Sequence, residues 1–182
     1  MAGKVNPIPE EYRGATPYLC VKEAARAIEF YKSAFGAREV MRMAQPDGRV
    51  GHAELRIGAA AIMLADEYPE MNFLSPPSIG GTPVNILVYV EDVDSLVKRA
   101  TADGAKLLRA VADQFYGDRV GVLEDPFGHC WSFATHIEDF SPEEMQKRAA
   151  AQHASRRVER DLSRFGNRGS ADVLYSAKGR AS

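Results

Sequence analysis

Asp-Gln-Phe-Tyr-Gly-Asp-Arg-Val-Gly-Val-Leu-Glu-Asp-Pro-Phe-Gly-His-Cys-Trp-Ser-Phe-Ala-Thr-His, residues 113–136, is the stretch of sequence that decides the fold. Two apolar runs within it, residues 119–123 and 130–135, have the composition of β-strands. Between them stands Asp125-Pro126-Phe127-Gly128, in which proline presets the φ angle of a turn and glycine accepts a left-handed conformation. The stretch therefore predicts a β-hairpin.

The chain repeats one pattern of elements. Strand-like runs and a helix with apolar residues at helical spacing follow in the same order twice, which predicts a β-α-β-β-β unit in residues 16–66 and another in residues 84–140. Val21 and Val90 precede the two helices and lie 69 residues apart, and the helix-ending Gly36 and Gly104 lie 68 apart. Because each unit alone leaves one sheet face open, we expect the units to pair, within the chain or between chains.

The segments outside these units have a different character. Residues 1–15 are expected to form an irregular arm, and residues 67–83 are rich in proline and glycine, which predicts a linker without regular structure. Ser141-Pro142-Glu143-Glu144 is typical of a helix start, and residues 141–182 hold nine Lys or Arg against five Asp or Glu. We expect a basic C-terminal helix followed by a mobile tail at residues 166–182.

Composition limits the partners of the protein. A net charge of −2 over 182 residues gives no drive towards nucleic acid or an anionic membrane. The chain contains neither a membrane-spanning apolar run nor the apolar core of a signal peptide, so we expect a cytoplasmic protein with no membrane partner. Cys20 and Cys130 lie in predicted strands and are expected to be buried thiols rather than a disulfide.

Glu-Asp-Pro-Phe-Gly-His at residues 124–129, ahead of a final strand and after a strand–helix unit, resembles the vicinal oxygen chelate superfamily of glyoxalase I, bleomycin-resistance proteins and extradiol dioxygenases. The fuller stretch 113–136, together with His-Ala-Glu-Leu-Arg-Ile-Gly at residues 52–58, is similar to the PhnB-like branch. The resemblance covers about residues 15–140. It implies an α+β fold of two β-α-β-β-β modules whose paired, curved, mixed sheets form a cup, with the C-terminal helix added, and it implies a homodimer.

The resemblance also implies where a divalent metal is held in glyoxalase-type members, by His or Gln on first strands and Glu on last strands. The matching positions in this sequence are Thr16, Asn85, Ser132 and Met63, with Ile62 in place of Met63 if the count starts from Gly58. None offers an imidazole or a carboxylate, so we predict no metal cofactor there. His129, Cys130 and His136 do not replace them, because neighbouring strand residues point to opposite faces.

Strand alternation predicts what lines the cup instead. The faces opposite the cup, expected to pack on the helices, include Leu19, Val21, Ile86, Val88, Trp131 and Phe133. The expected ligand-binding residues are Tyr18, Met63, Asn85, Tyr89 and Ser132. With two tyrosines to stack on a planar molecule, the sequence favours a metal-free binding protein for a small hydrophobic or aromatic molecule, similar to bleomycin-resistance members, over an enzyme.

Two further groups of residues leave alternatives open. His52 and Glu54 alternate on one predicted strand, either as a salt-bridged sheet face or as the acid/base pair of a glyoxalase-like lyase or isomerase, with or without a divalent metal. Asp113, Asp118 and Arg119 are expected to form a fixed turn with an internal Asp–Arg pair, with a lid over the cup as the alternative. The basic helix is either solvated or packed, or a docking surface for a partner.

Overall fold

The computed structural model describes residues 6–166, with side chains up to residue 154. One compact unit consists of the residues up to Asp113 together with Asp118–Ile137. A second unit consists of Gln114–Gly117 and the residues from Glu138 onward. Residues 167–182, which make up the tail predicted from the sequence beyond Gly166, lie outside the described residues.

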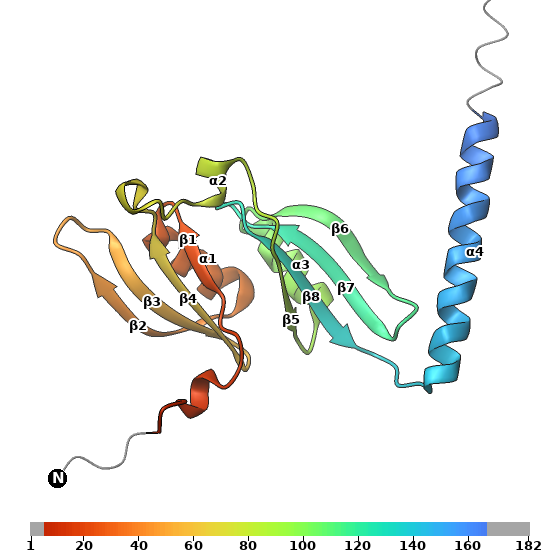
Figure 1. Cartoon of the computed structure of the whole chain (residues 1–182), viewed down its shortest axis with the longest axis horizontal. Helices are drawn as coiled ribbons and strands as arrows, with labels where there is room; N and C mark the ends of the chain where they lie inside the picture. Colours follow the sequence, from red (N-terminus) through yellow and green to blue (C-terminus); the bar gives the residue numbers. More distant parts are fainter. Residues whose placement is uncertain (1–5, 167–182) are drawn as a thin grey trace, which may run out of the picture. The chain divides into compact units, whose positions relative to one another are not determined.

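The first module places a four-stranded sheet on one helix. After the short 3-10 helix η1 (Glu10–Tyr12) come β1 (Tyr18–Val21), α1 (Ala24–Phe35), β2 (Arg38–Ala44), β3 (Val50–Ile57) and β4 (Ala60–Asp66). The strand order is β1-β4-β3-β2, with β1 parallel to β4 and the other neighbours antiparallel (Figure 1). Gly36 ends α1 in the left-handed conformation, with φ of 70°, as its sequence position predicts.

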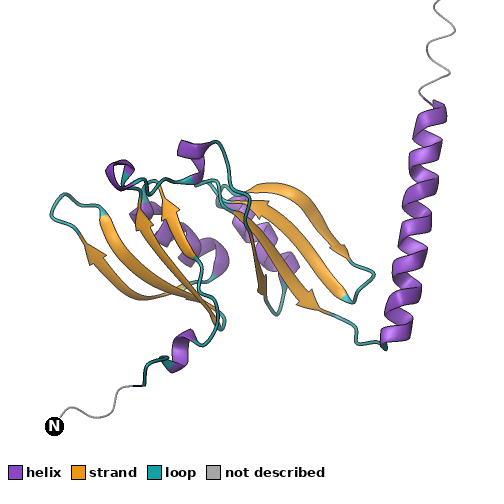
Figure 2. Cartoon of the chain, viewed as in Figure 1, coloured by secondary structure: helices purple, strands orange, loops and turns teal. Residues whose placement is uncertain are grey.

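The second module repeats this arrangement (Figure 2). It comprises β5 (Asn85–Tyr89), α3 (Val93–Ala102), β6 (Lys106–Asp113), β7 (Asp118–Glu124) and β8 (Cys130–His136), in the strand order β5-β8-β7-β6. Tyr18 pairs with Met63 in the first sheet and Leu87 pairs with Ser132 in the second, so both partners lie 69 residues further along the chain. The predicted α+β fold of two β-α-β-β-β modules with mixed sheets is confirmed, with the C-terminal helix added.

The segment between the modules departs from the prediction. Residues 67–83 contain the 3-10 helix η2 (Pro69–Met71) and the short helix α2 (Pro76–Ile79), so the expectation of no regular structure was wrong for these residues. Proline in the first turn of a helix is tolerated because the N–H it lacks has no partner within the helix. Gly80 then ends α2 with φ of 85°.

One hydrophobic core is shared by both modules. The six residues expected to face the helices are all buried in it: Leu19, Val21, Ile86, Val88, Trp131 and Phe133. The carboxylate of Asp125 is only 3% exposed and accepts hydrogen bonds from the Tyr31 hydroxyl at 2.7 Å and from Trp131 Nε1 at 2.9 Å. Tyr31 belongs to α1 and Asp125 to the turn before β8, so this satisfied buried carboxylate joins the two modules.

The second compact unit contains α4 (Pro142–Gly166), the expected C-terminal helix. The backbone N–H of Glu144 donates to Ser141 Oγ at 3.3 Å, which matches the helix start indicated by the sequence. Arg148 binds Glu138 at 2.7 Å and lies 4.2 Å from the ring centroid of Phe140. The second half of α4 contains the arginines at residues 156–164, and their side chains are not among those described.

Two expectations from composition can be compared with the structure. Cys20 and Cys130 are both free thiols, and Cys20 is buried while Cys130 is partly buried. Among the described residues, none of the helices combines the length and the apolar character that crossing a bilayer requires. A cytoplasmic location stays a prediction.

Candidate functional site

The face of the first sheet that points away from α1 carries a row of side chains across four strands. Tyr18 on β1 pairs with Met63 on β4, Met63 with Glu54 on β3, and Glu54 with Met41 on β2. His52 and Glu54 share this open face because β3 buries its alternate residues against the core. The pleat therefore fixes which side chains reach the open face.

Four polar side chains form a connected group on this face, here called the first-sheet cluster: Tyr12, Tyr18, His52 and Glu54. The Tyr18 hydroxyl lies 2.8 Å from His52 Nδ1, and His52 Nε2 lies 3.3 Å from Glu54 Oε1. Tyr12, from η1, donates its hydroxyl hydrogen to the other Glu54 oxygen. The N-terminal arm thus contributes a residue to the open face.

Electrostatics assigns a role to each member of the first-sheet cluster. The hydrogen bond from Tyr12, followed by the one from His52, holds the pKa of Glu54 below its usual value. Burial raises the pKa of Tyr18, which keeps its hydroxyl protonated at neutral pH. An ionised Glu54 accepts a hydrogen from His52 Nε2, and in a neutral imidazole Nδ1 is then the acceptor for the Tyr18 hydroxyl. This arrangement holds the imidazole of His52 between a hydroxyl donor and a carboxylate acceptor.

The second sheet also has an open face, set by the alternation of β5. Asn85, Leu87 and Tyr89 are exposed there, whereas Ile86 and Val88 are buried. The three open residues pair across β8 with Cys130, Ser132 and Ala134. This face is therefore more apolar than the first, with Leu87 54% and Tyr89 55% exposed.

Tyr89, Asp118 and His136 form the second-sheet cluster. The Tyr89 hydroxyl donates to Asp118 Oδ2 at 2.6 Å, and His136 Nδ1 lies 2.8 Å from Asp118 Oδ1. Asp118 is 6% exposed. Burial alone raises the pKa of Asp118, but the hydrogen bonds from Tyr89 and His136 outweigh it and hold the pKa below its usual value. The cluster is a fixed anion bound by two donors.

The structure divides the predicted site residues into two groups, one on each sheet. Tyr18, Met63, His52 and Glu54 lie together on the first sheet. Asn85, Tyr89 and Ser132 lie on the second. Strand alternation predicted these faces for all seven. Six of them are partly or largely exposed, whereas Ser132 is buried, at 8% exposure.

The expected Asp–Arg pair is present, between Arg119 and Asp113. Arg119 binds Asp113 at 2.7 Å and also Asp94 of α3, at 2.6 Å. Asp118 does not take part, because its side chain points to the other face of β7 and joins Tyr89. Asp118 was not predicted as a site residue. Strand alternation could have indicated it, because Asp118 lies on the same face of β7 as Val120 and Val122.

The positions that the resemblance implies for a metal do not fit one. Thr16 precedes β1, and Met63, Asn85 and Ser132 lie on β4, β5 and β8 with thioether, amide and hydroxyl groups. Zn, Ni and Fe favour imidazole, thiolate and carboxylate donors. In the part of the chain that the structure describes, no three His, Cys, Asp or Glu side chains are grouped where they could hold a metal ion. No metal-dependent step follows from this residue set.

Sequence comparison gives a family match over most of the chain. The model of the Glyoxalase/Bleomycin resistance protein/Dioxygenase superfamily matches residues 15–133. An uncharacterised protein of Mycobacterium bovis is 44% identical over 140 residues, which are 75% of this chain and 92% of that protein. An uncharacterised protein of Arabidopsis thaliana is 30% identical over 115 residues, 59% of this chain and 69% of that protein.

Solved structures show the same arrangement of elements. TioX from Micromonospora sp. ML1 superposes with a TM-score of 0.54 and 28% identity, covering 70% of this chain and 99% of that one. The structure of an Arabidopsis thaliana gene product gives a TM-score of 0.55 at 28% identity, covering 68% of this chain and 98% of that one.

Proposed function

The chain belongs to the glyoxalase/bleomycin resistance protein/dioxygenase superfamily, and we propose that it is a metal-free member that binds a small hydrophobic or aromatic molecule on the open faces of its sheets. Tyr18 and Tyr89 stack on the planar part of the ligand. Asn85 and Ser132 orient it by hydrogen bonds. Membership of the PhnB-like branch stays a prediction.

The observation that carries this proposal is that two tyrosines are about half exposed although their hydroxyls are hydrogen-bonded. Tyr18 and Tyr89 are 48% and 55% exposed, yet both hydroxyls are bound, to His52 at 2.8 Å and to Asp118 at 2.6 Å. An anchored hydroxyl restricts the side chain while about half of the residue stays open to solvent. Such rings lose little further conformational entropy when a planar molecule stacks on them, which favours binding.

The surroundings of the tyrosines fit the same ligand class. Met63 lies beside Tyr18 in the pairing register, and Leu87 stands two residues from Tyr89 on the same face. Asn85 provides an amide with both donors and acceptors, and Ser132 a hydroxyl. Mostly apolar walls with a few neutral polar groups are typical of small-molecule sites.

We extend the proposal to a homodimer in which a second copy covers the open faces. Large apolar side chains are exposed there and on the outer strands, including Met43, Leu87, Leu107 and Leu108, at 44–56% exposure. Exposed apolar groups of this kind mark interaction surfaces. Light scattering after size exclusion is expected to give about 40 kDa, twice the chain mass of 20.0 kDa. A 20 kDa species that still binds ligand would remove the dimer from the proposal.

The binding proposal is tested with acridone, a planar fluorescent aromatic, and with any molecule that native mass spectrometry finds bound after purification. The double variant Tyr18→Ala, Tyr89→Ala is expected to lose affinity about 100-fold, since each stacking ring contributes about 1–1.5 kcal/mol beyond its buried area. Tyr116→Ala, a tyrosine of the loop between β6 and β7, is the control. Equal affinity of the double variant and the control would contradict the proposal.

Metal content is a separate test of the same proposal. Protein purified without chelator and then offered Zn, Ni, Mn and Fe(II) is expected to retain far less than one metal per chain by elemental analysis. A value near one per chain would show that donors outside the positions discussed above assemble a metal site. The binding titration and the metal analysis can therefore fail independently.

The connected hydrogen bonds of the first-sheet cluster favour one second candidate, a glyoxalase-like lyase or isomerase. In that function His52 takes a proton from the substrate, and Glu54 orients the imidazole and stabilises its charged form. Glu54→Gln keeps the size of the side chain and is expected to lower turnover of a suitable substrate about 100-fold. Full activity of this variant would exclude the role of Glu54.

A further inference from the structure

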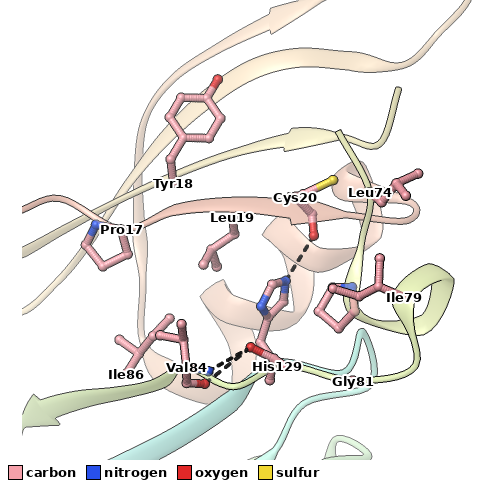
Figure 3. A pocket seen from close by; sticks show the side chains of 12 residues that line it. Pro17, Tyr18, Leu19, Cys20, Leu74, Ile79, Gly81, Val84, Ile86 and His129 are labelled. Carbon is pink, nitrogen blue, oxygen red and sulfur yellow. Dashed lines mark hydrogen bonds between the residues drawn. The ribbon is translucent and has the colours of Figure 1, made fainter. Parts of the chain in front are cut away.

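A cavity of about 330 Å³ lies between β1, β5 and the segment that contains α2. Its walls are mostly apolar and include Pro76. Figure 3 shows further side chains that form them, among them Leu19, Leu74, Ile79, Val84 and Ile86. Small-molecule sites begin at about this size. The cavity is large enough for a molecule of one or two rings.

The α2 wall of the cavity is held in place from two sides. Glu67, directly after β4, accepts hydrogen bonds from the hydroxyls of Ser75 and Ser78, both at 2.7 Å. On the other side Pro76 approaches the turn before β8 so closely that a Cβ at Gly128 would meet the Pro76 Cβ at 3.0 Å. The wall is thus fixed before any ligand arrives, which lowers the entropic cost of binding.

Three ionisable side chains line the cavity, those of Tyr18, Cys20 and His129. His129 is 8% exposed. Its Nε2 lies 3.1 Å from the carbonyl oxygen of Cys20, and because a carbonyl only accepts, Nε2 carries the hydrogen (Figure 3). Burial lowers the pKa of His129, so the ring is neutral at pH 7 and Nδ1 is an acceptor.

The Nδ1 atom of His129 stays accessible. Among the described residues, it hydrogen-bonds to no other protein group, and the hydroxyl of Tyr68 is the sole fully buried side-chain polar atom without a partner there. Nδ1 therefore reaches open space, and the open space beside the ring is the cavity. An almost fully buried acceptor in an apolar cavity selects for a ligand with a hydrogen to donate.

We propose that this cavity is a binding site for a small, mostly apolar molecule with one hydroxyl or N–H group, which donates a hydrogen bond to His129 Nδ1. The site differs from the one on the open faces. Tyr18 borders the cavity, but its ring points to the opposite side of β1 from Leu19 and from the ring of His129 (Figure 3). Neither His52 nor His136 lines it.

The test uses the full chain with ¹⁵N-labelled histidine and 2-naphthol as the probe. The ring nitrogens of His129 report on the cavity, while those of His52 and His136 report on the open faces. We expect saturable shifts at His129 Nδ1. The probe 2-methoxynaphthalene has a similar size but no hydrogen to donate, and it is expected to bind about fivefold more weakly, the contribution of one hydrogen bond.

A pair of matched variants makes the test specific. Ile79→Trp places a large ring in the cavity wall and is expected to weaken 2-naphthol binding at least tenfold, whereas Ile8→Trp alters an isoleucine of the same 59% exposure outside the cavity. Shifts confined to His52 or His136, equal affinities of the two variants, or no shift at the highest soluble probe concentration would each overturn the proposal. If the tyrosine variants lose acridone binding but 2-naphthol still shifts the His129 signals, the two sites bind independently.

Discussion

The open faces of the two sheets use the same kinds of side chain in different arrangements. In the first-sheet cluster the imidazole of His52 lies between Tyr18 and Glu54. In the second-sheet cluster the carboxylate of Asp118 lies between Tyr89 and His136. The tyrosines are not repeat equivalents, because Tyr18 corresponds in register to Leu87. The two modules therefore share one backbone register but differ in their polar groups. The first has a hydrogen-bonded imidazole at its centre, and the second has a buried anion.

This difference predicts unequal stability effects when one carboxylate in each cluster is neutralised. Asp118→Asn is expected to lower the free energy of unfolding by about 2 kcal/mol, because Asp118 is 6% exposed and binds two donors. Glu54→Gln is expected to cost about 1 kcal/mol, because the Glu54 side chain keeps 17% exposure and is reached by water. Urea unfolding measures both values, and equal costs would remove the distinction between the two clusters.

The two cysteines allow a comparison of the edge strand β1 with the interior strand β8. Burial, together with the nearby charges of Glu67 and Asp66, raises the pKa of the Cys20 thiol to about 11. Cys130 on β8 is less buried, although burial raises its pKa as well. At pH 8 we expect iodoacetamide to modify Cys130 about tenfold faster than Cys20, as followed by peptide mass spectrometry. Faster modification of Cys20 would show that β1 opens more readily than β8.

Removal of a single hydroxyl tests whether the anchoring of the tyrosines matters. Tyr18→Phe and Tyr89→Phe keep the stacking ring and lose its hydrogen bond, so acridone affinity is expected to fall about threefold in each variant. Tyr89→Phe should also lower the urea midpoint more than Tyr18→Phe, because buried Asp118 then loses one donor. Unchanged affinity in both phenylalanine variants would show that stacking alone suffices.

The smallest expected effect is a dependence of stability on acid pH. Glu54 and Asp118 both have a folded-state pKa below the usual value, so their stabilisation is complete above the ordinary carboxyl pKa of about 4 and is lost as pH falls through the lowered values. The urea midpoint should be flat near neutral pH and decline below about pH 4. Asp118→Asn should decline less steeply than the native chain over the same interval.

The fold could be predicted from the sequence because its signals are local. Alternation within short strands assigned Leu19, Val21 and Trp131 to the core, and Gly36 marked the end of α1. The short helix α2 was missed because its prolines were interpreted as breaks, although Pro76 stands in the first turn, where proline is tolerated.

The connections within the site could be predicted only in part. Alternation placed His52 and Glu54 on one face, but the bond from Tyr12 to Glu54 joins residues 42 positions apart, and the arm has no periodicity that points to it. Asp118 was grouped with Asp113 and Arg119 in one turn, whereas the pleat sends the adjacent side chains of Asp118 and Arg119 to opposite faces. His129 was considered only as a metal ligand, and its cavity depends on α2, which the sequence did not indicate.

The buried junction at Asp125 gives the protein an optical reporter. Trp131 is the single tryptophan of the chain, is fully buried and binds Asp125, which also binds Tyr31 of the other module. Its indole fluorescence therefore comes from one dry position where both modules meet. A molecule on the open faces leaves that emission nearly unchanged. Separation of the modules admits water and shifts the emission to longer wavelength. One spectrum therefore distinguishes ligand binding from loss of the contact between the modules.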